Sequence, residues 1–293
     1  MLLGQDADTP VFKGGVSDVR VDLQVLENGR LIENLTREDF KVYDNNVRRD
    51  IGFFGHEREP LSVVLLLDVS GSMGKFIKQL SAASSAALDQ LREGDSISIM
   101  VFGREQKVTL PFTSRRPEVI SALAEAVREK DVGSGTLINP ALIAAAQYVR
   151  DNAKTGRRAI IIVTDNLALN YQSPDETAIR ELHNANAVLN AIVVGKGNRP
   201  DEGPKSRYVN PEFSPANVFK IAEETGGEAI KAARMDEAFP ALMERIRARY
   251  SLLYGAPLGR SGEYREIRVE FTPEAKLRYP NAIIRSRKGY VVQ

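Results

Sequence analysis

Between residues 60 and 250 the sequence alternates short, continuously apolar segments with segments of helical period. Residues 61–68 and 158–164 are apolar at nearly every position, and a carboxylate ends or directly follows each run. Such runs are typical of strands buried on both faces. Strands that alternate with helices predict a doubly wound, mostly parallel sheet flanked by helices, a Rossmann-like α/β fold with right-handed crossovers.

The expected order of elements follows from these patterns. We expect strands at residues 61–68, 96–102, 107–112, 158–164, 188–194 and 228–231, with helices at residues 74–93, 117–129, 140–152, 174–184, 215–225 and 235–249. Only the turn Gly103-Arg104-Glu105 separates the second strand from the third. The third strand is therefore predicted to be an antiparallel edge.

Both flanks of this region have the pattern of strands and turns. Strands are expected at residues 16–26, 40–43, 47–54, 250–254, 266–271, 282–286 and 290–292, with hairpin turns at Asn28-Gly29 and Asp44-Asn45-Asn46. Neither flank alone has enough strands for a stable core. We therefore expect residues 1–57 and 250–293 to combine into one β-sandwich, with residues 58–249 forming the α/β domain.

Composition excludes several classes of protein. Forty basic residues against 39 acidic ones leave a formal charge of +1, so we expect no nucleic-acid partner and no attraction to an anionic membrane. The absence of cysteine excludes disulfides, thiolate zinc sites and cysteine nucleophiles. No apolar run approaches the ~20 residues of a membrane span.

Oxygen-bearing side chains gather where the predicted strands end. Asp68, Ser70 and Ser72 alternate as the first strand turns into a helix, so they point the same way. Asp165 follows another central strand, and Thr136 lies in a glycine-flanked loop. The loops at the carboxyl ends of parallel strands form the ligand crevice of such sheets. The five residues are therefore expected at one edge.

Two carboxylates and three hydroxyls are hard ligands that suit Mg²⁺, Mn²⁺ or Ca²⁺ and not zinc or copper. Because most of these ligands are neutral, the cation would keep an open position for an acidic group of a partner. Taken alone, Asp68-x-Ser70-x-Ser72 could also be a turn in which Ser72 caps the following helix. The positions of Thr136 and Asp165 favour the metal site.

This pattern resembles the metal ion-dependent adhesion site (MIDAS) of von Willebrand factor A (VWFA) domains, and it does so at all five positions in order. The resemblance extends over roughly residues 60–250. It implies that Ser70, Ser72 and Thr136 contact the metal directly or through water, while Asp68 and Asp165 hold it largely through water.

One residue departs from the pattern, because many members place glycine at the position of Asn166. The flanks, at residues 35–43 and 285–290, resemble a bacterial, acidobacterial-type group of VWFA-related proteins. That resemblance implies export to the periplasm or the extracellular space. The cytoplasm is the alternative.

The predicted function is a divalent-cation-dependent protein-binding or adhesion module, not an enzyme, that engages a carboxylate of a protein partner. One alternative is a metal-assisted phosphohydrolase with Asp68 as nucleophile. Against it, position 70 is serine, and the same turn offers neither a general acid nor a phosphate-binding lysine. The other alternative is a structural scaffold with a vestigial site.

Residues outside the metal pattern carry further expectations. Partner selectivity is expected from residues 166–173 and from residues 196–214, which include Arg199, Lys205, Arg207 and Tyr208. His56 and His183 are expected to be structural or solvated. The basic groups Arg245, Arg247 and Arg249, and Arg285, Arg287 and Lys288, are expected at a helix end and on an exposed strand face, respectively.

Overall fold

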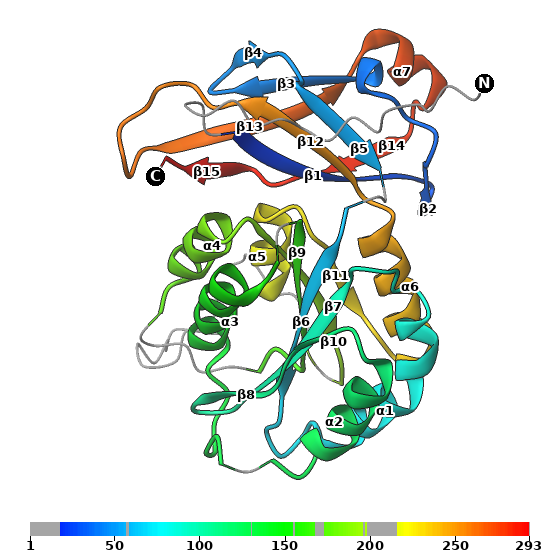
Figure 1. Cartoon of the computed structure of the whole chain (residues 1–293), viewed down its shortest axis with the longest axis vertical. Helices are drawn as coiled ribbons and strands as arrows, with labels where there is room; N and C mark the ends of the chain where they lie inside the picture. The colour runs from blue at the N-terminus through cyan, green and yellow to red at the C-terminus, as the bar shows by residue number, and fades with distance from the viewer. Residues whose placement is uncertain are drawn as a thin grey trace, which may run out of the picture.

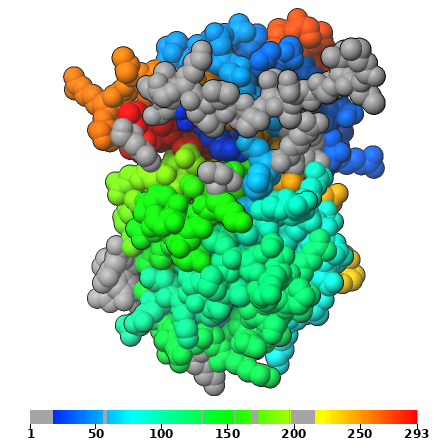
Figure 2. Space-filling model, viewed as in Figure 1, coloured from blue at the N-terminus to red at the C-terminus, as the bar shows by residue number. Residues whose placement is uncertain are grey.

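The computed structural model describes residues 18–56, 59–129, 131–154, 156–167, 173–195, 197 and 216–292. These residues form two units stacked along the long axis of the molecule (Figure 1). The middle of the chain makes an α/β unit, and the two flanks together make a β unit at one end, as the colours of Figure 2 show. No helix in this described part of the chain is long and apolar enough to span a membrane.

The α/β unit is built on one six-stranded sheet. Its strands are β6 (Leu61–Asp68), β7 (Ser96–Phe102), β8 (Gln106–Thr113), β9 (Arg157–Thr164), β10 (Ala187–Val193) and β11 (Ala229–Lys231), in the order β11-β10-β9-β6-β7-β8. All neighbouring strands are parallel except β7 and β8, which are antiparallel. The predicted doubly wound sheet with an antiparallel edge strand is therefore confirmed.

Helices cover both faces of this sheet. They are α1 (Gly74–Leu88), α2 (Arg116–Ala126), α3 (Ile138–Asn152), α4 (Asp175–Asn184), α5 (Val218–Glu224) and α6 (Met235–Arg247). Helices α1, α2 and α6 pack on one face, whereas α3, α4 and α5 pack on the other (Figure 1). Successive side chains of a strand point to opposite faces. Leu65 of β6 therefore lies in one core and Leu66 in the other, and both are fully buried.

The β unit contains two antiparallel sheets. Its strands are β1 (Asp18–Glu27), β2 (Arg30–Leu31), β3 (Phe40–Asp44), β4 (Val47–Arg49), β5 (Phe53–His56), β12 (Tyr250–Gly255), β13 (Tyr264–Phe271), β14 (Ala282–Arg285) and β15 (Gly289–Val291). One sheet has the order β14-β1-β12-β5, with β2 beside β1, and the other has the order β15-β13-β3-β4. Strands from the two ends of the chain pair in both sheets, and one shared core contains Leu23, Phe40 and Tyr250.

One expectation for the flanks was wrong, and one helix was missed. Residues 47–54 are not one strand, because the chain crosses between the sheets there: β4 pairs with β3, and β5 pairs with β12. Residues 273–278 were not expected to be helical, yet they form the short helix α7 (Pro273–Arg278), which Thr272 caps at its N-terminus. The turn at Asn28-Gly29 is confirmed, since both residues have positive φ, 51° and 78°.

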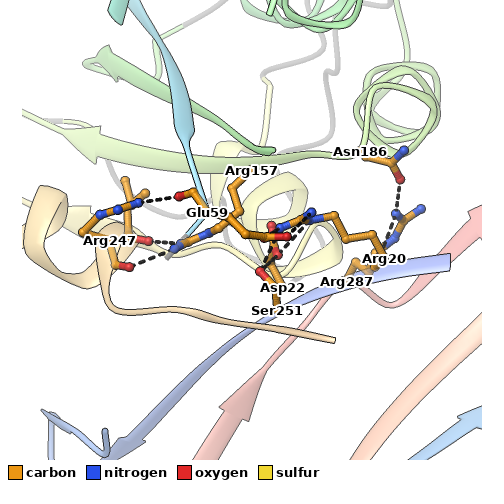
Figure 3. Close-up of polar contacts among 9 residues, drawn as sticks. Arg20, Asp22, Glu59, Arg157, Asn186, Arg247, Ser251 and Arg287 are labelled. Carbon is orange, nitrogen blue, oxygen red and sulfur yellow. Dashed lines mark hydrogen bonds and ion pairs between the residues drawn. The ribbon is translucent and has the colours of Figure 1, made fainter. Parts of the chain in front are cut away.

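A buried polar interface joins the two units (Figure 3). Asp22 of β1 accepts hydrogen bonds from the Ser251 hydroxyl (2.7 Å) and from Arg20 (3.2 Å). Arg20 also pairs with Glu59, which lies two residues before β6, so this ion pair links the two units. The β unit therefore packs near the amino ends of the parallel strands, and their carboxyl ends point away from it (Figure 1).

The expectation that Arg287 belongs to an exposed strand face was wrong. Arg287 is only 7% exposed and donates to the Asn186 side chain (2.7 Å) in this interface. Arg247 and Arg249 are also buried, and Arg247 contacts Asp95 (3.4 Å). These side chains are structural: Arg249 donates to the Gly226 carbonyl oxygen (2.7 Å) within the α/β unit, as Arg247 contacts Asp95 there, whereas Arg287 bonds across the interface.

Candidate metal centre

The two predicted carboxylates lie at the ends of adjacent strands. Asp68 is the last residue of β6, and Asp165 directly follows β9. The two strands are parallel and hydrogen-bonded, with Leu67 opposite Val163. Asp68 is fully buried and Asp165 is 6% exposed. The sheet thus brings both carboxylates to the same carboxyl edge, as predicted.

Hydrogen bonds fix both oxygens of the Asp68 carboxylate. The backbone N–H of Ser70 donates to Oδ1 (3.0 Å), and the hydroxyl of Thr164 donates to Oδ2 (2.7 Å). Thr164 is itself fully buried, and its Oγ1 accepts from the N–H of Asn166 (3.1 Å). Sequence reasoning missed Thr164, although a polar residue at the end of the apolar β9 run was a signal. The hydrogen bond from Thr164 to Asp68 holds the ends of β6 and β9 together.

The serines connect to the second carboxylate. The Ser72 hydroxyl donates to Asp165 Oδ2 (2.7 Å), and the Ser70 and Ser72 hydroxyl oxygens are 3.5 Å apart. The N–H of Leu167 donates to Asp165 Oδ1 (3.1 Å). The helix α1 has Met73 at its N-cap position, without a side-chain cap. Ser72 is therefore directed at Asp165, and the interpretation of Ser72 as a helix cap was wrong.

Thr136 reaches the same edge of the sheet from its glycine loop. The N–H of Leu137 donates to the Gly103 carbonyl (3.0 Å), and the N–H of Glu105 donates to the Val132 carbonyl (2.8 Å). Both contacts hold the loop against the end of β7, where Phe102 pairs with Asp68. Thr136 is 8% exposed. The loop thus lies beside β7, on the opposite side of β6 from Asp165.

The electrostatics of the site favour a cation. Burial raises the pKa of the Asp68 carboxyl group, and the charge of Asp165 adds to the rise, while hydrogen bonds from Ser70 and Thr164 oppose it. A divalent cation beside both carboxylates would remove this penalty. The donor set contains only oxygen, which fits Mg²⁺, Mn²⁺ or Ca²⁺. The residues present therefore fit the predicted metal.

The departure at Asn166 leaves the backbone in a conformation that glycine favours. Asn166 has φ 55°, in the left-handed region, which asparagine tolerates better than most residues.

Most residues expected to select partners lie outside the described part of the chain. They are residues 168–172 and the four side chains Arg199, Lys205, Arg207 and Tyr208. Leu167, one of the expected partner-selecting residues that the structure does describe, has an exposed apolar side chain.

Comparison with known proteins identifies this α/β unit. Residues 63–167 match the family model of the von Willebrand factor type A domain, and the match spans all five predicted ligands. Residues 63–167 are therefore similar to a von Willebrand factor type A domain, which confirms the resemblance and the fold class.

Solved structures of low sequence identity share the fold. A von Willebrand factor type A structure from Catenulispora acidiphila is 14% identical, with a TM-score of 0.50, over 97% of this chain and 76% of that one. Proximal thread matrix protein 1 from the mussel byssus, solved with a zinc-occupied MIDAS motif, is 12% identical, with a TM-score of 0.51, over 71% of this chain and 50% of that one.

A curated relative is an uncharacterized protein of Borreliella burgdorferi. It is 21% identical over 178 residues, which cover 56% of this chain and 52% of the relative. This chain thus spans about half the length of that protein.

Proposed function

We propose that this protein is a divalent-cation-dependent protein-binding module. Asp68, Ser70, Ser72, Thr136 and Asp165 would hold the cation, and a carboxylate of a protein partner would complete its coordination. The observation that carries the proposal is a series of side-chain hydrogen bonds from Ser70 through Ser72 to Asp165. The buried Asp68 carboxylate joins this series because it accepts the N–H of Ser70.

The two sides of the site differ in exposure, and this difference supports a macromolecular partner. Asp68 is closed off by the end of β9 through Thr164, whereas Ser72 is exposed and Ser70 is half-buried. A partner would therefore approach from the hydroxyl side. The bound cation would supply the positive charge that attracts a carboxylate, while the two aspartates would anchor it from beneath.

Mg²⁺ or Mn²⁺ is the proposed cation, with Ca²⁺ as the alternative, because all the donors are oxygens. A structure of this fold is described with zinc in its MIDAS motif, which supports a divalent ion at this position. The resemblance of the flanks supports an exported protein.

The buried position of Asp68 argues against the phosphohydrolase alternative. A nucleophilic carboxylate must present an oxygen to its substrate. Both oxygens of Asp68 instead accept hydrogen bonds, and the residue is fully buried beneath the serines. We therefore propose a site that binds and does not catalyse.

The proposal can be tested with a minimal acidic probe. The probe is a blocked glycine-serine peptide with one glutamate, and its control carries glutamine at that position. Surface plasmon resonance on the immobilised full chain should show binding of the glutamate peptide in Mg²⁺, and loss of that binding in EDTA or with Asp68→Ala. Equal binding of both peptides, or binding that survives EDTA, would contradict the proposal.

A further inference from the structure

An arginine sits at the tip of the hairpin that joins β7 to β8, against the loop that carries Thr136. A Cβ atom on Gly103 would lie only 2.5 Å from the carbonyl oxygen of Gly133. The Gly103 carbonyl in turn accepts the N–H of Leu137 (3.0 Å). Gly103 therefore lets the hairpin pack directly on the backbone of the Thr136 loop, and Arg104 is the next residue.

The side chain of Arg104 passes over the two glycines of that loop. A Cβ on Gly133 would lie 3.3 Å from Arg104 Cβ and 4.0 Å from its Cδ, and one on Gly135 would lie 3.9 Å from Arg104 Cβ. Both glycines have positive φ, 70° and 128°. Because Gly135 directly precedes Thr136, Arg104 lies beside the backbone that leads into Thr136.

The charge of Arg104 is available to a partner. Arg104 is exposed, and the ion pairs among the described residues do not include it. The next cation on the hairpin, Lys107, is in contrast paired with Glu129 (2.9 Å) and Asp131 (3.2 Å). The rim of the metal site on the Thr136 side therefore carries an exposed guanidinium that no described carboxylate neutralises.

We infer that Arg104 is a specificity-determining residue that selects partners with a second carboxylate beside the one that reaches the cation; this inference rests on the proposed function. A guanidinium binds a carboxylate through two parallel N–H bonds, which the ammonium group of a lysine, a point charge, does not do. In an extended chain, residues i and i+2 point the same way about 7 Å apart. The partner's recognition segment is thus an extended acidic strand of the Glu-x-Glu kind.

The inference is tested with two blocked glycine-serine peptides, one with a single glutamate and one with Glu-Ser-Glu. In Mg²⁺ the wild-type full chain should bind the two-acid peptide roughly three- to fivefold more tightly, as expected for a partly exposed ion pair. Arg104→Gln should lose most of this preference and keep only the statistical advantage of a peptide with two carboxylates that can each reach the cation. The control Arg48→Gln removes an exposed arginine of β4 in the other unit and should keep the wild-type preference.

The outcomes separate the two proposals. Mg²⁺-dependent binding of the single-acid peptide with an unchanged preference in Arg104→Gln would overturn the role of Arg104 and leave the proposed function standing. The role of Arg104 would also be overturned if wild type showed no preference for the two-acid peptide, or if Arg48→Gln lost the preference equally. Absence of Mg²⁺-dependent binding of either peptide to wild type would overturn both proposals.

Discussion

Thr164 offers a sharp test of how the fold supports the metal site. Thr164→Val keeps the shape and the β-branch of the side chain but removes its hydroxyl. Asp68 Oδ2 would lose a 2.7 Å hydrogen bond, and the N–H of Asn166 would lose its 3.1 Å acceptor. Both groups would stay buried, because Thr164 and Asp68 are fully enclosed.

The expected cost has two parts. Leaving a buried polar group without its partner costs about 1–3 kcal/mol of folding stability. Residues that orient metal ligands from behind typically change metal affinity by about 10–100-fold when they are altered. We therefore expect Thr164→Val to remain folded at room temperature, with a lower midpoint of unfolding and a Mg²⁺ affinity reduced by at least about tenfold.

Calorimetric Mg²⁺ titration and urea unfolding, each on the full chain, measure the two effects. The matched control is Thr109→Val on the edge strand β8, where the hydroxyl donates over 3.4 Å to the Ile99 carbonyl, far from Asp68. The control should leave Mg²⁺ affinity unchanged. If Thr164→Val binds Mg²⁺ as tightly as wild type, Thr164 does not position Asp68.

Three further predictions concern the β unit and its interface. Burial and the charge of Arg287 lower the pKa of His183 to about 4. The stability that this neutral histidine contributes is therefore present above about pH 6.5 and falls by about 2 kcal/mol between pH 7 and pH 5. Urea midpoints should show that pH dependence in wild type and lose it in His183→Gln. Asp22→Asn leaves buried arginines without their carboxylate and should cost about 3–5 kcal/mol in the same assay, whereas Asp50→Asn at an exposed position should cost less than about 0.5. We also propose residues 58–249 as a separate domain, so a fragment of residues 60–249 should fold and bind Mg²⁺. A fragment of residues 1–57 should show no cooperative unfolding, since its β1 lacks the pairing with β12. A stable 1–57 fragment would refute the shared β core.

The sequence predicted those features that depend on local pattern. The apolar run of β6 indicated a strand buried on both faces, and parallel strands necessarily bring Asp68 and Asp165 to one edge. Gly103-Arg104-Glu105 predicted the antiparallel edge strand through its turn chemistry. These features are encoded within a few residues or follow from the geometry of a doubly wound sheet.

The features that the sequence did not predict depend on contacts between distant segments. Thr164 bonds to Asp68 only because β6 and β9 pair in one particular register. Arg287 is buried because the β unit docks on the C-terminal end of α4, where Arg287 contacts His183 and Asn186, and the strand pattern of residues 282–286 does not reveal this contact. The division of residues 47–54 into two strands depends on which sheet each half joins.

The proposed metal centre requires that this edge of the sheet bind a divalent cation through Asp68. Isothermal titration of Mg²⁺ into the full chain should show one saturable site in wild type and none in Asp68→Ala, with the same far-ultraviolet circular dichroism for the two proteins. Mn²⁺ should give the same contrast. Equal binding of Mg²⁺ by wild type and a folded Asp68→Ala variant would contradict a metal site built on Asp68.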